Sequence, residues 1–413
     1  MRNRVVITGL GCISPLGNSV EDAWQALMAG KSGAGPITHF DASQHKTKFA
    51  CEVKDFDPAA LFGGRESRRM DRFTQFAVAA SMQALEHSGL QVTDSNRDRI
   101  GVVVGCGIGG IGTMSEQVGV LAEKGPDRVS PFLVPMMISD TSAGMTAIHL
   151  GLRGPNMAVV TACASGNNAI GEATEMIRRG AADVMLAGGA EAAIVPLAMA
   201  GMNVMGALST RNEDPLTASR PFDKTRDGFV MGEGGVMLTI ELLDHALARG
   251  ANILAEISGY GTTDDAYHIS APAENGSGAA KCMKIALDNA GLGLGDIGYI
   301  NAHGTSTSLN DKSETAAIKT VFGEGAYNIP VSSTKSMTGH MIGAAGAMEA
   351  MICTLVFHHN ILPATIHYAN PDPDCDLDVI PNTPRPASPR HIMSNSFGFG
   401  GHNATLVFSR FEK

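Results

Sequence analysis

The sequence lacks paired cysteines. Its seven cysteines are odd in number, are scattered along the chain and form no CxxC motif. This arrangement argues against a disulfide framework and against a thiolate zinc site, and it favours a reducing compartment such as the cytoplasm. The seven are Cys12, Cys51, Cys106, Cys163, Cys282, Cys353 and Cys375.

Positive charge and long apolar runs are also scarce. The net charge of −10 disfavours nucleic-acid binding, which requires a basic surface. Apolar stretches are repeatedly broken by glycine, proline or charge, so we expect no membrane span. A strand predicted at residues 4–9 follows the first residues at once and leaves no room for a secretory signal. These absences predict a soluble cytoplasmic protein with no nucleic-acid and no membrane partner.

Glycine and hydrophobic residues are abundant instead. The chain has 413 residues, of which 49 are glycine and 44% are hydrophobic, which is enough to bury a large core. This length exceeds the usual size of one core, so we expect two domains or one duplicated domain. The order of strands and helices recurs once, which predicts an α/β protein with two βαβ-rich halves, 1–250 and 251–413.

Hydrophobic periodicity predicts the individual elements. The strand at 157–161 is apolar and β-branched, as expected for a strand covered on both faces. Loops are expected at 31–62, 124–135 and 209–227, the last crossing the surface. Helices are expected at 20–29, 67–88, 140–150, 164–178, 277–290, 313–322 and 343–357. Strands are expected at 4–9, 100–104, 157–161, 182–188, 235–243, 255–261, 297–302, 331–333, 394–399 and 404–408.

Cys163 stands where the strand at 157–161 meets the helix at 164–178. The free N–H groups and the positive dipole end of a helix favour a thiolate, so we expect a thiol pKa below the usual value of about 8.5. A sharp strand-to-helix turn also exposes its side chain at the carboxyl end of a sheet, where α/β proteins keep their sites. The position suits a nucleophile, and the alternative is a buried structural cysteine.

A glycine-rich run at 105–112 contains GxGxxG in two registers. A dinucleotide-binding fingerprint also requires a following helix and a second strand that ends in an acidic residue. Here a loop punctuated by prolines is expected instead, so we reject a dinucleotide cofactor. The glycines are expected to let the backbone approach a ligand or a packed helix closely.

Two histidines of the second half complete a candidate site. His303 and His340 each stand beside glycine where a strand gives way to a loop. A single histidine so placed is more often a packing or hydrogen-bonding residue. Together with Cys163, two of them support acyl transfer through a thioester and stabilisation of an oxyanion or enolate. Zinc ligation by the same three residues is the alternative, but their spacing matches no usual zinc motif.

Four ordered motifs carry a resemblance to a known family. The chain resembles the elongating β-ketoacyl-acyl-carrier-protein synthases from Val5 to Phe408, and among them the type II synthases of dissociated fatty acid synthesis. The resemblance implies the thiolase fold, a duplicated five-layered α-β-α-β-α architecture, and a homodimer. The motifs are Thr161-Ala162-Cys163, Asn301-Ala302-His303-Gly304-Thr305-Ser306-Thr307, Ser333-Thr334-Lys335-Ser336-Met337-Thr338-Gly339-His340 and Asn395-Ser396-Phe397-Gly398-Phe399-Gly400-Gly401.

The resemblance implies a decarboxylative Claisen condensation in fatty acid elongation. Cys163 would take an acyl chain from the 4′-phosphopantetheine of an acyl carrier protein as a thioester. His303 and His340 would hold the thioester oxygen of the malonyl carrier while carbon dioxide leaves, because two neutral N–H donors stabilise the enolate. The enolate would attack the acyl-cysteine and give a 3-oxoacyl carrier, with no bound cofactor.

Further residues match the family's site. Lys335 is expected to organise the histidines electrostatically, whereas the bare sequence favours a surface cation. Phe399 is expected to act as a gate between glycines, with its backbone N–H and that of Cys163 forming an oxyanion hole, and a core aromatic is the alternative. Ile108 would border the acyl pocket. The other expected substrate-binding residues are Ser270, Thr305, Thr307 and Phe397.

Two features of the resemblance concern details of the site. The family often holds a structural monovalent cation, and the matching positions are Asn301, Glu349 and Asn395, while no catalytic metal is expected. His402 stands where many members have threonine, which affects the expected local hydrogen bonding and not the activity. Ser270 likewise occupies a position where threonine is common.

A basic cluster is the expected docking surface for an acidic carrier protein. Arg65, Arg68, Arg69 and Arg72 fall within about two turns at the start of the predicted helix 67–88. Because the chain itself is acidic, a local cluster of cations is needed to steer an anionic helix. A solvated basic face is the alternative. Lys124, Arg128 and Arg211 are further candidates.

Other functions remain open from the sequence alone. Biosynthetic thiolases use a second cysteine as base and initiating synthases use Cys-His-Asn, so His340 argues against both. A non-catalytic chain-length partner would lack Cys163. A ketosynthase of a polyketide assembly would share Cys163, His303 and His340. A pure binding module would have no need for these residues at strand ends in both halves.

Overall fold

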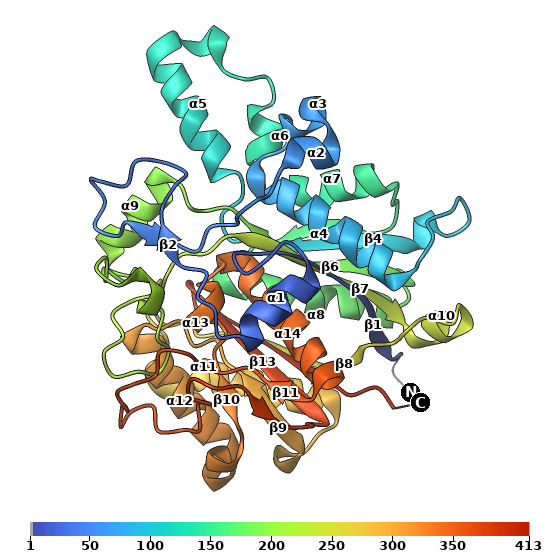
Figure 1. The fold of residues 1–413 in the computed structure, drawn as a ribbon. Helices are drawn as coiled ribbons and strands as arrows, with labels where there is room; N and C mark the ends of the chain where they lie inside the picture. The colour runs from blue at the N-terminus through green and yellow to red at the C-terminus, as the bar shows by residue number, and fades with distance from the viewer. Residues whose placement is uncertain (1–2, 413) are drawn as a thin grey trace.

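A ten-stranded mixed sheet, built from two similar halves, forms the framework of the molecule (Figure 1). The structure is a computed structural model and describes residues 3–412. The strand order is β10-β9-β13-β14-β8-β1-β7-β6-β4-β5. The halves join where β1 pairs with β8 over only two residue pairs, Val6 with Glu256 and Ile7 with Ala255.

The two halves of the sheet repeat one topology. In the first half β4 runs parallel to β5 and β6, and β7 runs antiparallel to β6 and β1. In the second half β9, β10, β13, β14 and β8 pair in the same way. The strands are β1 (Val5–Ile13), β4 (Ile100–Gly105), β5 (Asn156–Val159), β6 (Val184–Glu191), β7 (Gly234–Leu242), β8 (Ala255–Asp264), β9 (Ile297–Asn301), β10 (Val331–Ser332), β13 (His391–Gly398) and β14 (His402–Ser409).

Two short antiparallel strand pairs and many helices complete the chain. The pairs are β2 (Gly35–Pro36) with β3 (Phe49–Ala50) and β11 (Ile361–Leu362) with β12 (Arg385–Pro386). The helices are α1 (Val20–Met28), α2 (Pro58–Phe62), α3 (Gly64–Ser67), α4 (Arg72–Ser88), α5 (Ile111–Lys124), α6 (Leu133–Met137), α7 (Thr141–Leu150), α8 (Ser165–Arg178), α9 (Pro196–Met205), α10 (Leu243–Ala248), α11 (Ser277–Ala290), α12 (Ser308–Phe322), α13 (Lys335–Thr338) and α14 (Ala345–His359). A division into domains at residue 250 stays a prediction.

Helices fill the space between the two half-sheets and cover their outer faces (Figure 1). α8 and α14 pack against each other in the middle, α4 and α7 cover the first half, and α11 and α12 cover the second. The central pair is very close, because a Cβ on Gly166 would lie 2.7 Å from the backbone nitrogen of Ala347. The resulting arrangement is a five-layered α-β-α-β-α stack.

A long apolar helical segment lies at the centre of this stack. Ile342–His359 is the one segment of residues 3–412 that is long and apolar enough to cross a membrane, with a mean hydropathy of 1.2, and 89% of it is buried inside the molecule. It packs in the main hydrophobic core with the strands and helices around it. Its apolar character is therefore that of a core helix.

The helix predicted at 67–88 is shorter than expected. α4 begins at Arg72, where the Asp71 side chain accepts the backbone N–H of Phe73 at 3.3 Å. The preceding residues form the separate short helices α2 and α3. An aspartate N-cap competes with continued helix at its own position, and a pattern of apolar spacing alone does not reveal this break.

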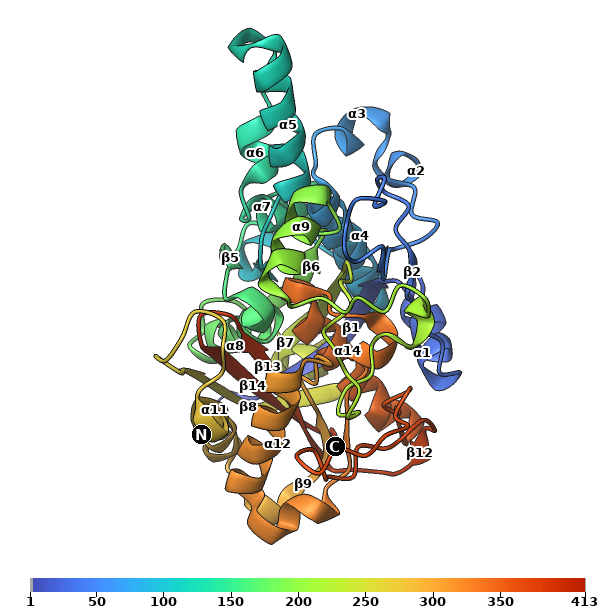
Figure 2. The same cartoon turned by 90° about the vertical axis from the view of Figure 1, so that its left-hand side faces the viewer.

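Residues 111–137 contain two helices where the sequence predicted no helix and, at 124–135, a loop. Residues 111–124 form helix α5, whose side chains are all at least partly exposed, and with α6 it projects from the body of the molecule (Figures 1 and 2). The helix lacks the buried apolar stripe by which helices are recognised in a sequence. The rejected dinucleotide site stays rejected, because the next strand, β5, ends in Val159 and not in an acidic residue.

Two further expectations about burial were wrong. β5 is the last strand of the sheet and is partly exposed, with Met157 at 40%. An apolar edge strand and a central strand have the same composition, so the sequence could not separate them. The segment 209–227 is partly interior, because Asp223 is fully buried and accepts the backbone N–H groups of Ala369 and Asn370 at 2.7 Å.

Candidate active site

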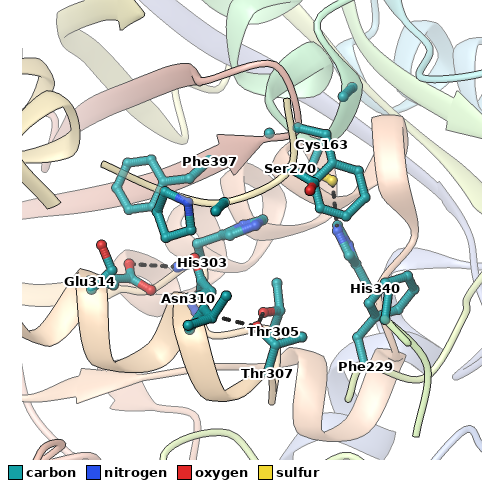
Figure 3. A pocket seen from close by; sticks show the side chains of 18 of the residues that line it. Cys163, Phe229, Ser270, His303, Thr305, Thr307, Asn310, Glu314, His340 and Phe397 are labelled. Carbon is teal, nitrogen blue, oxygen red and sulfur yellow. Dashed lines mark hydrogen bonds between the residues drawn. The ribbon is translucent and has the colours of Figure 1, made fainter. Parts of the chain in front are cut away.

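The ends of parallel strands from both halves converge on one cavity of about 390 Å³. Cys163 follows β5, His303 follows β9, and Phe399 follows β13, while Lys335 and His340 follow β10. Sites in α/β proteins form at such carboxyl ends. Nine of the ten predicted catalytic and substrate-binding residues line the cavity, and several are drawn in Figure 3. They are Ile108, Cys163, Ser270, His303, Thr305, Thr307, His340, Phe397 and Phe399.

A tight turn presents Cys163 to this cavity. Ala162 has a φ of +49°, a left-handed conformation that is unfavourable for alanine, and α8 begins two residues after Cys163. The Ser165 hydroxyl fixes the turn, because it accepts the Thr161 N–H at 2.9 Å and donates to the Ala162 carbonyl at 2.7 Å. The strain is of the kind that folds retain at functional positions.

The two histidines meet the cysteine directly. His340 points at the sulfur, with 3.0 Å between its Nε2 and Cys163 Sγ (Figure 3). The rings of His303 and His340 stand almost perpendicular, at 85°, with centroids 5.4 Å apart. The backbone N–H of His340 donates to the Val230 carbonyl at 2.7 Å, which anchors this histidine against the first half.

Both imidazoles are held neutral. Burial lowers the pKa of His303 and His340 well below the ordinary value, and the nearby Lys335 charge lowers both pKa values further. The Nδ1 atoms of both rings make no hydrogen bond within residues 3–412. Neither tautomer is fixed, so each ring can accept a proton or donate one.

The expected low pKa of Cys163 is wrong. Burial raises the pKa of this thiol to about 12, although the Lys335 charge and the backbone N–H of Phe399 partly oppose the shift. Desolvation of the buried sulfur outweighs the favourable helix end. The resting residue is a neutral thiol in hydrogen-bond contact with the neutral Nε2 of His340.

Lys335 is buried and does not line the cavity. Its side chain is 1% exposed and forms an ion pair with Glu349, whose side chain is 2% exposed. Burial raises the pKa of Glu349 to about 7, and the Lys335 charge opposes this shift. The surface-cation alternative is excluded, and the position fits a charge that acts on the histidines through space.

Phe399 occupies a glycine-rich turn between β13 and β14. It is half-buried, so it is not a core aromatic, and its backbone N–H bonds to Cys163. Gly400 and Gly401 have φ values of +88° and +86°. The turn is tied to the segment after β8, because the Gly400 N–H donates to the Ile269 carbonyl at 2.8 Å. His402 lies 3.7 Å from Asp264 beside this turn.

The wall opposite the cysteine is polar. The hydroxyls of Thr305 and Thr307 lie 2.9 Å apart (Figure 3), and Thr307 also caps α12 by accepting the Asn310 N–H at 3.4 Å. The ring of Phe397 stands 5.8 Å from that of His303. Two hydroxyls beside the histidines fit an amide-bearing thioester arm.

Glu314 is a site residue that the sequence did not reveal. It is buried on α12, and its two carboxylate oxygens accept the backbone N–H groups of His303 and Gly304, both at 2.8 Å (Figure 3). Asn395 donates to the same carboxylate at 3.3 Å. A glutamate on a polar helix gives no signal in the sequence, since its role depends on a loop that folds back onto it.

The predicted carrier-docking cations do not form one cluster in the structure. Arg72 is half-buried and bonded to Glu233 at 2.8 Å, so it is a structural residue. Arg65 and Arg68 are exposed near α3, and Arg69 stacks on Phe132 of the α6 region, 5.1 Å from its ring centre. Lys124 and Arg128 are exposed at the tip of the projecting α5 segment, and Arg211 donates to the Thr225 carbonyl at 3.0 Å.

The positions matched to a structural cation fit only in part. Both side-chain polar atoms of Asn301 and one carboxylate oxygen of Glu349 are buried without a hydrogen-bond partner within residues 3–412, and such oxygens suit a hard cation. The Asn395 side chain is already engaged with Glu314 and Thr405. A cation at Asn301 and Glu349 stays a prediction.

Comparisons with known proteins agree with this geometry. The chain is 53% identical over 411 residues to the 3-oxoacyl-[acyl-carrier-protein] synthase 2 of Synechocystis sp., covering 100% of this chain and 99% of the relative. Among solved structures, the ishigamide ketosynthase/chain length factor matches with a TM-score of 0.94 at 39% identity, covering 100% of both chains. A type II polyketide ketosynthase in complex with its acyl-carrier protein and bound to the hexaketide matches with a TM-score of 0.92 at 35% identity, again covering 100% of both chains.

Family models account for most of the sequence. The N-terminal domain of beta-ketoacyl synthase matches residues 2–246, and the C-terminal domain matches residues 254–369. The thiolase-like α/β fold implied by the sequence motifs is confirmed by these matches and by the structural neighbours. The chain belongs to the β-ketoacyl synthase family.

Proposed function

We propose that the protein elongates acyl chains by decarboxylative Claisen condensation of an acyl-enzyme thioester with a malonyl carrier protein, in type II fatty acid synthesis. The observation that carries the proposal is the contact of 3.0 Å between His340 Nε2 and Cys163 Sγ, with a second neutral imidazole, His303, beside it. A cysteine and two neutral histidines supply a nucleophile, a base and two enolate-stabilising donors.

Acyl transfer is the first half of the reaction. The Cys163 sulfur attacks the thioester carbon of the acyl carrier while its proton passes to His340, which is neutral and in contact. The backbone N–H groups of Cys163 and Phe399 stabilise the oxyanion. The carbon–sulfur bond to the carrier breaks, and the proton passes from His340 to the leaving thiolate.

Condensation is the second half. The bond between the malonyl methylene and its carboxylate breaks, carbon dioxide leaves, and the electron pair forms an enolate. Its oxygen accepts hydrogen bonds from ring N–H groups of His303 and His340. Because Nδ1 of His340 has no partner within residues 3–412, its ring proton can lie on the nitrogen that faces the enolate in this step. The enolate carbon attacks the acyl carbonyl on Cys163 and the bond to sulfur breaks. The released thiolate takes up one proton from solvent by way of His340, so each turnover consumes one proton. The product is a 3-oxoacyl carrier longer by two carbons.

An acyl carrier protein is the proposed partner, and the cytoplasm is the proposed location. The relatives' names include the acyl carrier protein, and one structural neighbour is a complex with an acyl-carrier protein. Arg65 and Arg68 are exposed, and the chain is acidic overall, so these cations offer a local attraction for an acidic carrier. The seven free cysteines suit a reducing compartment.

A homodimer is proposed from the edge of the sheet. β5 ends the sheet with one edge unpaired within residues 3–412, and exposed apolar side chains gather on β5 and the segments before it. An unpaired apolar edge is a site for strand addition, and a second copy closes it symmetrically. The exposed apolar residues of this region are Met114, Val118, Leu121, Phe132, Val134, Ile138, Ile148, Met157 and Val160.

A polyketide ketosynthase is the second candidate function. It is favoured by the two ketosynthase structures that match over the whole chain. The higher identity, 53%, to a 3-oxoacyl-[acyl-carrier-protein] synthase 2 favours elongation. Both functions require the same cysteine and histidines.

Product analysis separates these functions. The enzyme is mixed with a long-chain acyl carrier and a malonyl carrier, and the products are measured by mass. We expect one 3-oxoacyl carrier, longer by two carbons, and one carbon dioxide per turnover. Repeated condensation without reduction would identify a polyketide ketosynthase, and discharge of the acyl group by acetyl-coenzyme A would identify a thiolase. Full activity after dialysis against a chelator is expected, and its loss would favour zinc ligation.

A further inference from the structure

We propose that Glu191 is a positioning residue that ties the wall of the acyl cavity to the loop carrying His340 and thereby sets which acyl chain lengths react. The inference rests on the proposed condensation function. It concerns a buried carboxylate at the end of β6, which the sequence motifs did not single out.

The carboxylate of Glu191 gathers backbone N–H groups from both halves of the molecule. The side chain is fully buried, and it accepts the N–H of Gly107 at 2.6 Å, of Ile108 at 3.3 Å and of Gly343 at 3.1 Å. The Cys106 thiol also bonds to it at 3.4 Å. Burial raises the pKa of Glu191 to about 7, and the N–H groups of Gly107, Gly343 and Ile108 oppose this shift because they favour the charged carboxylate. Such a cluster fixes three backbone positions at once.

The bonded segments lie at the cavity. Gly107 and Ile108 follow β4 and line the cavity on the acyl side. Gly343 comes three residues after His340 and directly after Ile342, which also lines the cavity. The carboxylate therefore links the expected acyl wall to the loop of the proposed base.

The walls touch where Glu191 holds them. A Cβ on Gly343 would lie 2.4 Å from the Gly107 nitrogen, and a Cβ on Gly107 would lie 2.6 Å from Ile342 Cγ2. Glycine is needed at both positions because the backbones approach so closely. Loss of the carboxylate would remove the hydrogen bonds that hold the two backbones at this close distance.

The duplicated fold supplies an internal comparison. β9 is the counterpart of β4, and the loop after β9 donates two consecutive N–H groups, those of His303 and Gly304, to Glu314. The loop after β4 donates two consecutive N–H groups to Glu191 in the same manner. One carboxylate positions the proposed catalytic histidine, and the other positions Ile108.

Loss of the Glu191 hydrogen bonds should affect acyl chains of different length to different degrees. A longer acyl chain presses harder on Ile108, so the anchored wall decides how much room the chain finds. Glu191→Gln replaces one acceptor oxygen with an NH₂ donor, which then faces N–H groups and breaks at least one bond. The wall should loosen, and the preference among acyl lengths should change.

The experiment compares Glu191→Gln with wild type and with Glu241→Gln. Glu241 is an equally buried carboxylate on β7, where it binds Arg249, His245 and Thr8 away from the cavity. The rate of acyl transfer to the enzyme is measured for a series of acyl carriers of increasing length. We expect Glu191→Gln to change the ratio of long-chain to short-chain kcat/KM by about fivefold or more. Glu241→Gln is expected to leave that ratio unchanged while lowering the melting temperature.

The inference is overturned if the acyl-transfer rate of Glu191→Gln depends on acyl length as it does in the wild type. It is also overturned if Glu191→Gln and Glu241→Gln lose the same fraction of that rate at every acyl length. If Glu191→Gln does not fold, Glu191→Asp takes its place, because the shorter side chain cannot reach both Gly107 and Gly343. If neither folds, hydrogen exchange in the wild type decides. The backbone amide hydrogens of residues 105–110 and 341–345 should exchange at similar rates, as expected for segments that open together. Different exchange rates in the two segments overturn the inference. Absence of condensation by the wild type contradicts instead the proposed function.

Discussion

The reactive residues are neutral before substrate binds, and this charge state determines the order of proton transfers. Burial keeps the Cys163 thiol protonated and the His303 and His340 rings unprotonated. A preformed thiolate and imidazolium pair is therefore not the resting state. In the proposed mechanism the proton therefore leaves sulfur as the carbon–sulfur bond forms, because burial disfavours a free thiolate.

Removal of either imidazole should impair decarboxylation. His303→Ala or His340→Ala takes away one of two donors to the enolate oxygen, so we expect the release of carbon dioxide from a malonyl carrier to fall about a hundredfold or more. His358→Ala, at an exposed position on α14, is the matched control and should retain activity. Retention of decarboxylation in both site variants would contradict the assigned roles.

The Lys335 charge should set the acid limit of acyl transfer. The double variant Lys335→Met/Glu349→Gln removes a charge that lowers both histidine pKa values, without leaving a buried carboxylate unpaired. The pKa of His340 should rise toward its ordinary value while burial still holds it low, so His340 becomes protonated and loses its base function at a higher pH than in wild type. The measurement is the rate of Cys163 acylation against pH, with the exposed Lys312→Met as control. If acylation in the double variant falls off at the same acidic pH as in the wild type, Lys335 acts only structurally.

At the scale of elements, the sequence predicted several of the helices and strands that surround the site. α8, α11 and α14 and the strands that end at the site lie close to their expected positions. The start of α4 was misplaced because Asp71 caps the helix from a position that the apolar spacing ignores. α5 was missed because its apolar side chains face outward.

The site was predictable to the same degree and for similar reasons. Cys163, His303 and His340 stand in local motifs at strand ends, and the structure brings them together. The high pKa of the thiol depends on its enclosure by both halves, which no local pattern contains. Glu191 and Glu314 bind loops that are remote in sequence, so their roles became visible only with the fold.

The short helix α3 should contribute to carrier binding. Reversal of charge at Arg65 and Arg68, as Arg65→Glu/Arg68→Glu, should raise KM for carrier-bound substrate about tenfold and spare a small soluble thioester, because only the carrier meets this surface. Lys284→Glu, on the exposed side of α11, is the matched control. An equal rise in KM for both substrates would contradict the proposed docking surface and would indicate damage to the active site.

At the scale of the whole molecule, duplication explains why the site lies where it does. Each half directs three parallel strand ends toward the same central region, and α8 and α14 hold the halves together between them. The nucleophile comes from one half and the histidines from the other. The reaction therefore depends on the contact between the halves, and Glu191 and the backbone of His340 both bridge it.

The proposed dimer makes its own prediction at this scale. Val160→Asp places a charge on an exposed apolar position beyond β5, so it should weaken self-association. Light scattering should give twice the chain mass for wild type and a shift toward a single chain for the variant. Val204→Asp, at an exposed position on α9, is the comparison. A wild type that stays a single chain at micromolar concentration would contradict the dimer.

The central claim is that Cys163 carries the acyl chain. The most direct test is the intact mass of the protein after mixing with a long-chain acyl carrier, for wild type, Cys163→Ala and the buried control Cys375→Ala. We expect one acyl adduct on wild type and on Cys375→Ala, none on Cys163→Ala, and discharge of the adduct by a malonyl carrier to the longer 3-oxoacyl carrier. An adduct that persists in Cys163→Ala, or its absence from wild type, would show that Cys163 is structural and that the account is wrong.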